Sequence, residues 1–263
     1  MLSIIIPTYN EEKFLPRALA SIGRQSYRDY EIIVADAGSR DWTRKIAHNF
    51  GAKVVEGGMP GPGRNAGAAA SRGNILLFFD ADIILDDENF LRECLAEFHR
   101  RKLDVATCSV SPIFNKAVDK VFHKIFNIYM RTRAATSLSP HAPGFCIFAK
   151  RVAHEKINGF DETVVFAEDK DYVTRAVKSG ARFRVLNSRK ISVSVRRFDR
   201  DGRWNIVKRY LLAEAHHILR GSVRKELFPY EFGKYDEIPV SKTGRFFKRK
   251  SDKIKQRLWR KSK

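Results

Sequence analysis

Two carboxylates close a strongly apolar segment of the chain. Residues 74–79 read NILLFF, and Asp80 and Asp82 follow with one apolar residue between them. Charges in apolar surroundings are costly unless they are paired or bind a metal ion. Residues i and i+2 of a strand share a face, so two carboxylates at this spacing repel each other unless a cation lies beside them. The pattern indicates Mg²⁺ or Mn²⁺, which hold waters and substrate phosphates. Capping of the next turn is the simpler alternative.

A second acidic cluster lies in the segment FAEDKDY, which contains Glu168, Asp169 and Asp171. Neighbouring carboxylates raise the pKa of one another, and a general base that works near neutral pH needs such a shift. The same acids would complement the dipole at the start of a helix in KDYVTRAVKSG. Both interpretations can hold, because a carboxylate at a helix N-terminus can also act as a general base.

Strands and helices alternate along the first part of the chain. The predicted strands are residues 2–8, 30–38, 52–57 and 74–82, and the predicted helices are residues 11–25, 42–50 and 63–73. We expect Asp41 to cap the second helix and Gly51 to end it. This alternation is typical of parallel βαβ units, which bind ligands beyond the carboxyl ends of their strands. Asp80 and Asp82 are therefore expected to face a crevice rather than the core.

Composition sets wider limits on the class of protein. The chain has 263 residues, 43% of them hydrophobic, enough for one large α/β domain or two small ones. Cys94, Cys108 and Cys146 lack metal-ligand spacing and are expected to be free thiols of a cytosolic protein. The start MLSIIIPTYN does not resemble a signal peptide, and no apolar run reaches the ~18 residues of a spanning helix.

Positive charge is concentrated near the end of the chain. Residues 241–263 contain eleven Lys or Arg and one Asp, which is half of the formal net charge of +20. Phe247, Ile254 and Leu258 fall on one helical face. The pattern predicts a helical basic extension that contacts an anionic membrane surface. A solvated, partly disordered tail is the main alternative. Nucleic-acid binding is a third interpretation, and we do not expect it.

Five motifs occur in order over residues 1 to about 180: IIIPTYNEEKFL, IIVADAGSRDWT, GRNAGAAASRGNILLFFDAD, NGFDE and FAEDKDYVTRA. In these motifs the chain resembles the family 2 glycosyltransferases, enzymes of the GT-A fold that depend on nucleotide-sugar donors. The resemblance implies an α/β, Rossmann-like fold with a mostly parallel sheet flanked by helices. We expect a GT-A domain over residues 1–220, followed by the basic extension 221–263. Within the domain, residues 1–110 would bind the donor and residues 111–220 the acceptor.

The resemblance also assigns roles to residues of the donor half. It implies a nucleoside pocket lined by Pro7, Thr8, Tyr9 and Glu11, a base-binding carboxylate at Asp36, a nucleotide contact at Arg64, a ribose and metal contact at Asp80, and a direct metal ligand at Asp82. The family often has a second acid after the first, where this chain has Ala37. Uridine is therefore favoured by family frequency alone. A turn-forming role of Asp36 before Gly38 is the local alternative.

The implied reaction inverts the configuration at the anomeric carbon of the sugar. An acceptor hydroxyl attacks the anomeric carbon while the nucleoside diphosphate leaves, and the cation acts as a Lewis acid on the diphosphate. The resemblance implies that Asp169 takes the hydroxyl proton and that Glu168 lies beside it on the acceptor side. A phosphate acceptor would need no base, so we expect a hydroxyl of a saccharide or of a lipid-linked acceptor.

Two segments bear on the acceptor. Arg200, Arg203 and Trp204 resemble the R-x-x-R-W motif that meets acceptor and diphosphate in processive members, although the segment is rich in Arg and a chance match is a serious rival. Without a spanning helix, we do not expect a processive polymer synthase. Residues 116–135 are expected to form a helix with Val118, Phe122, Ile125, Phe126 and Tyr129 along one stripe.

Two other classes of function remain open. A nucleotidyltransferase would share the acid pair, but PTYNEE after the first strand contains no glycine-rich loop. A non-catalytic protein that binds membrane or nucleic acid through its charge would not require acids at separate strand ends. We expect a cytoplasmic protein that associates peripherally with the cytoplasmic face of the membrane.

Overall fold

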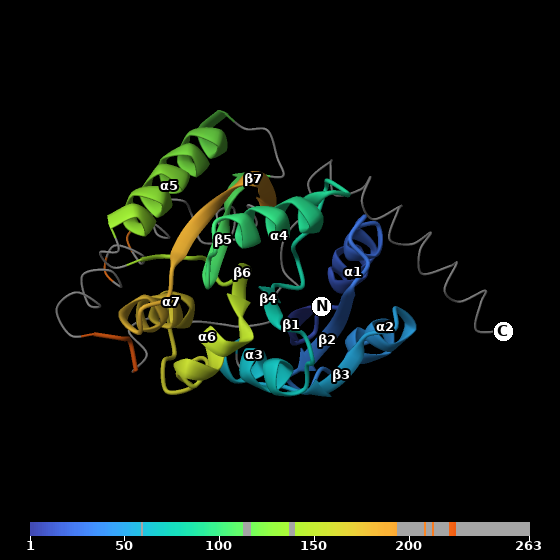
Figure 1. Ribbon diagram of the computed structural model, residues 1–263. Helices are drawn as coiled ribbons and strands as arrows, with labels where there is room; N and C mark the ends of the chain where they lie inside the picture. The colour runs from blue at the N-terminus through green and yellow to red at the C-terminus, as the bar shows by residue number, and fades with distance from the viewer. Residues whose placement is uncertain are drawn as a thin grey trace. The chain divides into compact units, whose positions relative to one another are not determined.

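The structure is a computed structural model (Figure 1), and it describes residues 1–58, 60–112, 117–136, 140–193, 208, 212 and 221–224. All of these residues belong to one compact unit, Met1–Tyr230. The strands are β1 (Leu2–Thr8), β2 (Tyr30–Asp36), β3 (Lys53–Glu56), β4 (Ile75–Phe79), β5 (Val105–Pro112), β6 (Cys146–Lys150) and β7 (Phe183–Val193). The helices are α1 (Leu15–Gly23), α2 (Thr43–Asn49), α3 (Pro60–Ala69), α4 (Phe90–Arg100), α5 (Ala117–Thr136), α6 (Arg151–Lys156) and α7 (Glu168–Lys178).

The strands form one seven-stranded sheet in the order β3-β2-β1-β4-β6-β5-β7. The first four strands along the chain pair in parallel, with β1 between β2 and β4. β6 runs antiparallel to both β4 and β5, and β7 is parallel to β5. The predicted α/β class with a mostly parallel sheet is confirmed, although the sequence patterns did not reveal the antiparallel β6.

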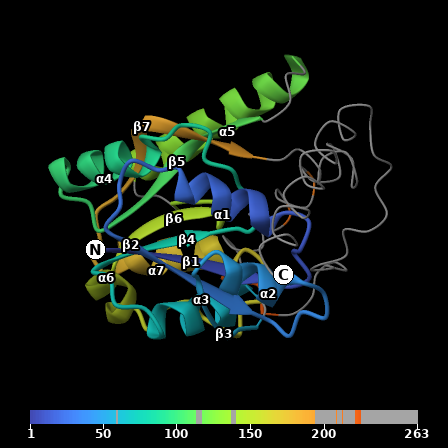
Figure 2. The same cartoon turned by 90° about the vertical axis from the view of Figure 1, so that its right-hand side faces the viewer.

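The centre of the sheet is buried on both faces. All seven residues of β1 and all five of β4 are buried. Helices α1 and α4 cover one face, and α3 and α6 cover the other (Figure 2). Parallel strands that are covered on both sides read as continuous apolar runs. Each fully buried Leu, Ile or Phe stabilises such a core by roughly 1.5–3 kcal/mol, which fixes the strand ends in space.

Close packing of α3 on β1 depends on glycine. A Cβ atom at Gly67 would lie 2.4 Å from Cγ2 of Ile5, so a side chain there would force the helix away from the strand. This approach explains the small residues of the segment GRNAGAA. It also brings Arg64, on the buried side of the same helix, toward the carboxyl end of the sheet.

Several predicted boundaries shift by a few residues. The first helix begins at Leu15 rather than residue 11, because the amide of Phe14 bonds to the carbonyl of Glu11 in a separate turn. Asp41 accepts the amide hydrogen of Thr43 at 2.9 Å, although the cap position of α2 itself is the next residue. Gly51 follows α2 with φ of 75°, as expected for a helix stop.

The predicted helix over 116–135 is confirmed as α5, but its predicted stripe is not a single face. Ile125 is 60% exposed, whereas the rings of Phe126 and Tyr129 are partly buried and pack against His141. The adjacent positions 125 and 126 are rotated by about 100° on a helix, so they face different environments. Nothing is described for the side chains of Val118 and Phe122.

Candidate active site

The two acids after β4 lie on a turn. β4 ends at Phe79, and the amide of Ile83 donates to the carbonyl of Asp80 at 3.3 Å. The prediction that both carboxylates lie on one face of a strand is therefore wrong, because β4 ends before the first of them. Ala81 is 4% exposed, whereas Asp80 and Asp82 both keep partial access to solvent. The turn thus leaves the two carboxylates at the surface of the sheet edge rather than in the core.

Arg64 connects these acids to the second acidic cluster. Its Nη2 lies 3.2 Å from Oδ1 of Asp80, and its Nη1 lies 2.6 Å from Oε1 of Glu168. The Arg64 side chain is buried, and burial alone would lower its pKa. The charges of Glu168 and Asp80 outweigh that effect and raise the pKa of Arg64. The structure therefore brings together two acidic motifs that are distant in sequence, with one cation between them.

Gly144 completes this connection to Asp169. The carbonyl of Gly144 accepts a hydrogen bond from Nη2 of Arg64 at 3.2 Å, and its amide donates to Oδ2 of Asp169 at 2.7 Å. A Cβ atom at residue 144 would lie 2.6 Å from Nη2 of Arg64. A side chain at residue 144 would therefore displace the guanidinium from its present position. No sequence motif indicated a role for Gly144, because it precedes β6 without any local pattern.

The environment of Asp169 changes its acidity. Burial and the charge of Glu168 raise the pKa of Asp169 to about 7, against the opposing effects of Arg64 and of the amides of Lys170 and Gly144. The sequence predicted that repulsion between neighbouring acids would raise the pKa. Burial of Asp169 makes the larger contribution to the raised pKa. Asp171 differs, because it is buried and its Oδ2 lies 2.6 Å from Nε of Arg175. Asp169 thus combines a raised pKa with partial access to solvent.

The ends of β1 and β2 meet at Thr8 and Asp36, which are paired in register. Asp36 is 3% exposed and accepts hydrogen bonds from the Thr8 hydroxyl at 3.0 Å and from the Ser39 hydroxyl at 2.6 Å. The Ser39 amide donates to its other oxygen at 2.9 Å. These bonds are those of a turn-forming aspartate. Recognition of a nucleotide base by Asp36 stays a prediction.

The loop after β1 contains the remaining residues of the predicted nucleoside pocket. Pro7 is buried near the end of β1, and Tyr9 in the loop that follows is partly buried. Glu11 is 6% exposed, and its amide donates to Oγ1 of Thr43 at 2.8 Å. The loop is thereby anchored on the first turn of α2, next to the end of β2. This anchoring keeps the predicted pocket residues at the same edge of the sheet as Asp80.

Asp80 and Asp82 fit a cation that the substrate helps to bind. Among residues 1–58, 60–112, 117–136 and 140–193 and the few described beyond them, no three His, Cys, Asp or Glu side chains form a metal site by themselves. Mg²⁺ and Mn²⁺ are commonly held by one or two carboxylates together with substrate phosphates and waters. The two acids would therefore suit a cation of this kind whose remaining ligands come from a diphosphate and waters.

Asn65 is a further residue that the sequence analysis missed. Its Nδ2 donates to the carbonyl of Phe160 and to Glu162, each at 2.9 Å, and its Oδ1 accepts the Phe160 amide at 2.8 Å. These bonds join α3 to the loop that precedes α7. Asn65 follows Arg64 directly, so adjacent residues of α3 hold both the loop and the acids after it.

Other predicted site residues lie in parts of the chain that are not described. These are Arg200, Arg203, Trp204 and the basic segment 241–263. Their roles stay predictions, and so does the division of the chain at residue 220. Cys94, Cys108 and Cys146 are free and buried, as expected. No helix in the described part of the chain is both long and apolar enough to cross a membrane.

The sheet order and its flanking helices define the GT-A fold. The chain is similar to the mannosyltransferase PcManGT from Pyrobaculum calidifontis, solved in complex with GDP-Man and Mn²⁺. The TM-score is 0.64 at 21% identity, and the match covers 74% of this chain and 56% of that one. A likeness at this level of identity supports the fold. The family model described as glycosyl transferase family 2 matches residues 3–158, and the chain belongs to this family.

Two curated relatives illustrate the range of the family. The chain is 37% identical over 110 residues to a 4,4'-diaponeurosporenoate glycosyltransferase of Staphylococcus haemolyticus, covering 38% of this chain and 29% of the relative. It is 25% identical over 200 residues to the poly(ribitol-phosphate) beta-N-acetylglucosaminyltransferase TarS of Staphylococcus aureus, covering 71% of this chain and 34% of the relative. The matches thus span about a third of the length of these relatives.

Proposed function

We propose that this protein is an inverting, metal-dependent glycosyltransferase that moves a sugar from a nucleoside-diphosphate sugar to a hydroxyl group. The observation that supports this function best is the position of Arg64 between Asp80 and Glu168. Arg64 connects the end of β4, where we expect the donor to bind, to the acids that we expect to activate the acceptor hydroxyl. UDP-sugars are our favoured donors by family frequency, and the similar mannosyltransferase was solved with GDP-Man.

In this proposal the donor lies along the carboxyl ends of β1, β2 and β4. Pro7, Thr8, Tyr9, Glu11 and Asp36 would line the nucleoside pocket, Arg64 and Asp80 would face the nucleotide, and Asp82 with Asp80 would hold Mg²⁺ or Mn²⁺. When bound, such a cation would stabilise negative charge on the leaving diphosphate. The positive charge of Arg64 lies at the same edge and would add to this stabilisation.

Asp169 is our proposed general base. The oxygen of the acceptor hydroxyl attacks the anomeric carbon, the bond from that carbon to the diphosphate oxygen breaks, and the hydroxyl proton moves to the carboxylate. A base with a pKa near 7 is ionised to a useful extent at neutral pH and still holds a proton well. The amide of Gly144 fixes one oxygen of Asp169, which leaves the carboxylate in a defined orientation. Glu168 would lie beside it on the acceptor side.

The acceptor class follows from the need for a base. Since phosphate acceptors are already anionic, a saccharide hydroxyl or a hydroxyl of a lipid-linked acceptor suits the site better. Arg200, Arg203 and Trp204 are retained as proposed contacts to acceptor or diphosphate on the R-x-x-R-W resemblance alone.

A panel of nucleotide sugars with Mg²⁺ or Mn²⁺ tests the function. We expect a thermal shift and slow donor hydrolysis with one donor, both abolished by EDTA, and release of a nucleoside diphosphate. Release of pyrophosphate would instead indicate a nucleotidyltransferase. The absence of a response to every donor and cation would leave a non-catalytic binding protein as the better account.

We also propose that the protein binds the surface of an anionic membrane through α5. Val121, Ile125 and Ile128 are 56%, 60% and 57% exposed and occupy one face of this helix. Lys124 and Arg131 are exposed along one edge of that face. An apolar helix face edged with positive charge is typical of interfacial helices, and the basic segment 241–263 would add attraction.

Vesicle sedimentation tests the membrane proposal. We expect the protein to sediment with vesicles that contain anionic lipid and much less with neutral vesicles. Ile125→Glu with Ile128→Glu should weaken this binding by roughly tenfold or more. Val152→Glu is a matched control, because Val152 is 69% exposed on α6, away from α5 (Figure 1). Equal binding of the double variant and of the control would contradict a role for α5.

A further inference from the structure

A short segment late in the chain lies against the loop that precedes α7. We call residues 221–224 the strap. The amide of Val165 donates to the carbonyl of Val223 at 3.0 Å, and Phe166 and Val223 form an isolated antiparallel bridge. Val223 is only 3% exposed. The strap thus forms a short β-bridge with Val165 and Phe166, which precede Glu168 by two to three residues.

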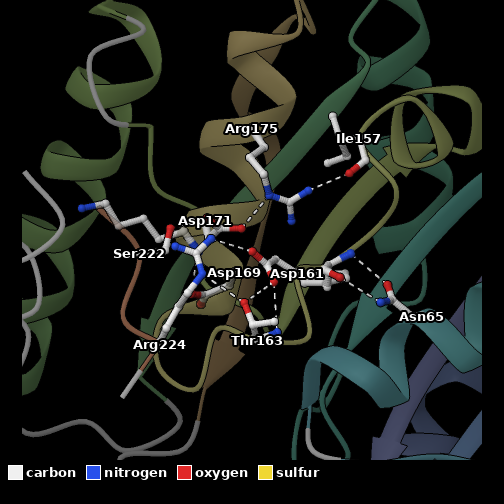
Figure 3. Close-up of polar contacts among 11 residues, drawn as sticks. Asn65, Ile157, Asp161, Thr163, Asp169, Asp171, Arg175, Ser222 and Arg224 are labelled. Carbon is white, nitrogen blue, oxygen red and sulfur yellow. Dashed lines mark hydrogen bonds and ion pairs between the residues drawn. The ribbon is translucent and has the colours of Figure 1, made fainter. Parts of the chain in front are cut away.

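Side chains fasten the strap at both of its ends (Figure 3). Nη2 of Arg224 lies 2.9 Å from Oδ2 of Asp161, and its Nε donates to Oγ1 of Thr163 at 3.0 Å. The Ser222 hydroxyl donates to Oδ1 of Asp171 in the first turn of α7. The strap therefore connects the start of the loop to the start of the helix, and Glu168 and Asp169 lie between the two connections.

The backbone between these connections adopts a conformation that needs support. Ala167 has φ of 57°, which is uncommon for a residue with a side chain because Cβ approaches the neighbouring backbone. Asp169 follows two residues later and accepts its hydrogen bond from Gly144. Any movement of the Ala167 turn would rotate the first turn of α7 and lengthen that bond.

The two connections differ in strength. The Arg224 side chain is 56% exposed, so its ion pair with Asp161 is screened by solvent. Asp171 is 4% exposed, so loss of the Ser222 hydroxyl would leave a buried carboxylate oxygen without this donor. We therefore expect Ser222 to matter more than Arg224.

We propose that the strap is a positioning element for the acidic pair, in which Ser222 and Arg224 hold the N-terminus of α7 so that Asp169 stays aligned on Gly144. This inference rests on the proposed function for its meaning, because it concerns the alignment of the proposed base. Ser222 and Arg224 are positioning residues, since they act through Asp171 and the loop rather than on the substrate.

Steady-state kinetics test the proposal. Ser222→Ala should lower kcat by roughly 10- to 100-fold with little change in donor KM, because misalignment affects the reacting groups and not the donor pocket. Ser222→Thr should restore kcat, since it keeps the hydroxyl. Arg224→Gln should have a smaller effect in the same direction. Lys156→Gln is its matched control, because the Lys156 amine donates to the carbonyl of Ser179 at the opposite end of α7.

Hydrogen exchange of the full-length protein gives a readout that does not require turnover. We expect amides of residues 161–172 to exchange faster in Ser222→Ala than in the native protein, and to be unchanged in Lys156→Gln. Unchanged exchange, or a Ser222→Ala variant with native kcat, would overturn the positioning role. Parallel losses of kcat and donor binding in Ser222→Ala would also overturn it. Absence of turnover in the native protein with faster exchange in Ser222→Ala would contradict the proposed function alone.

Discussion

The two ends of the candidate site are built in different ways. At the proposed donor end, Thr8, Asp36 and Asp80 stand at or just beyond the ends of β1, β2 and β4, which pair directly and in parallel. At the base end, Asp169 depends on Gly144 and Arg64, which come from segments far apart in the chain. The first end is positioned by a buried sheet and the second by individual polar contacts. We therefore expect changes at the donor end to affect binding, and changes at the base end to affect turnover first.

Replacement of Arg64 should have the largest effect, because this residue belongs to both ends. Arg64→Met would leave Asp80 and Glu168 without their shared cation, and the cost stays below the about 3–5 kcal/mol of a fully buried pair because both carboxylates keep partial access to solvent. We expect a loss of thermal stability together with loss of donor binding and turnover. Arg72→Met is a suitable control, because the Arg72 side chain is 79% exposed and pairs with Glu31 at the surface. Similar melting temperatures for the two variants would contradict the joining role of Arg64.

Gly144→Ala should separate the two ends. The new Cβ would lie 2.6 Å from Nη2 of Arg64, and overpacking of this kind costs about 1–3 kcal/mol. We expect kcat to fall strongly and donor binding, measured by thermal shift, to fall less, because the displaced Nη2 of Arg64 also pairs with Asp80. Gly23→Ala is a matched control, since a Cβ there meets nothing within 4 Å. If donor binding fell as strongly as kcat, the base end would not be separable from the donor end.

The pH dependence of turnover should reflect Asp169. Its pKa is raised to about 7, and the base must be ionised to accept a proton. The rate should therefore rise about tenfold per pH unit below 7 and level off above it. Donor binding measured over the same range should change little, because the donor end does not include this carboxylate. A rate that is flat from pH 5 to 8 would contradict the assignment of Asp169 as base.

The pH dependence of the melting temperature of Asp169→Asn should show a smaller effect, which does not depend on turnover. The folded-state pKa of Asp169 lies above its ordinary value of 3.8, so between the two values the folded protein binds more protons than the unfolded chain. Ionisation of Asp169 therefore lowers stability as pH rises through this window. We expect the melting temperature of Asp169→Asn, relative to the native protein, to increase from pH 4 to pH 8. A constant or falling difference would contradict the raised pKa.

The sequence predicted the elements around Asp80 better than the contacts around Asp169. Strands β1 to β4 and the helices between them follow from hydrophobic runs and glycine positions, and the family motifs located Asp80, Asp82, Glu168 and Asp169. Local patterns could not predict β6, which is antiparallel, or the turn that begins at Asp80. They also could not predict that Gly144 lies between Arg64 and Asp169, because contacts between distant segments have no periodic trace in the sequence. Ser222 and Arg224 were missed for the same reason.

The central claim is that one site holds a donor through Asp82 and activates an acceptor through Asp169. The most direct test measures cation-dependent donor binding and turnover in Asp82→Asn and Asp169→Asn side by side, with Glu155→Gln on the exposed face of α6 as a control. We expect Asp82→Asn to lose cation-dependent donor binding, and Asp169→Asn to bind the donor normally while turnover falls by about 10²-fold or more. Near-normal turnover in Asp169→Asn, or normal cation-dependent binding in Asp82→Asn, would contradict the claim.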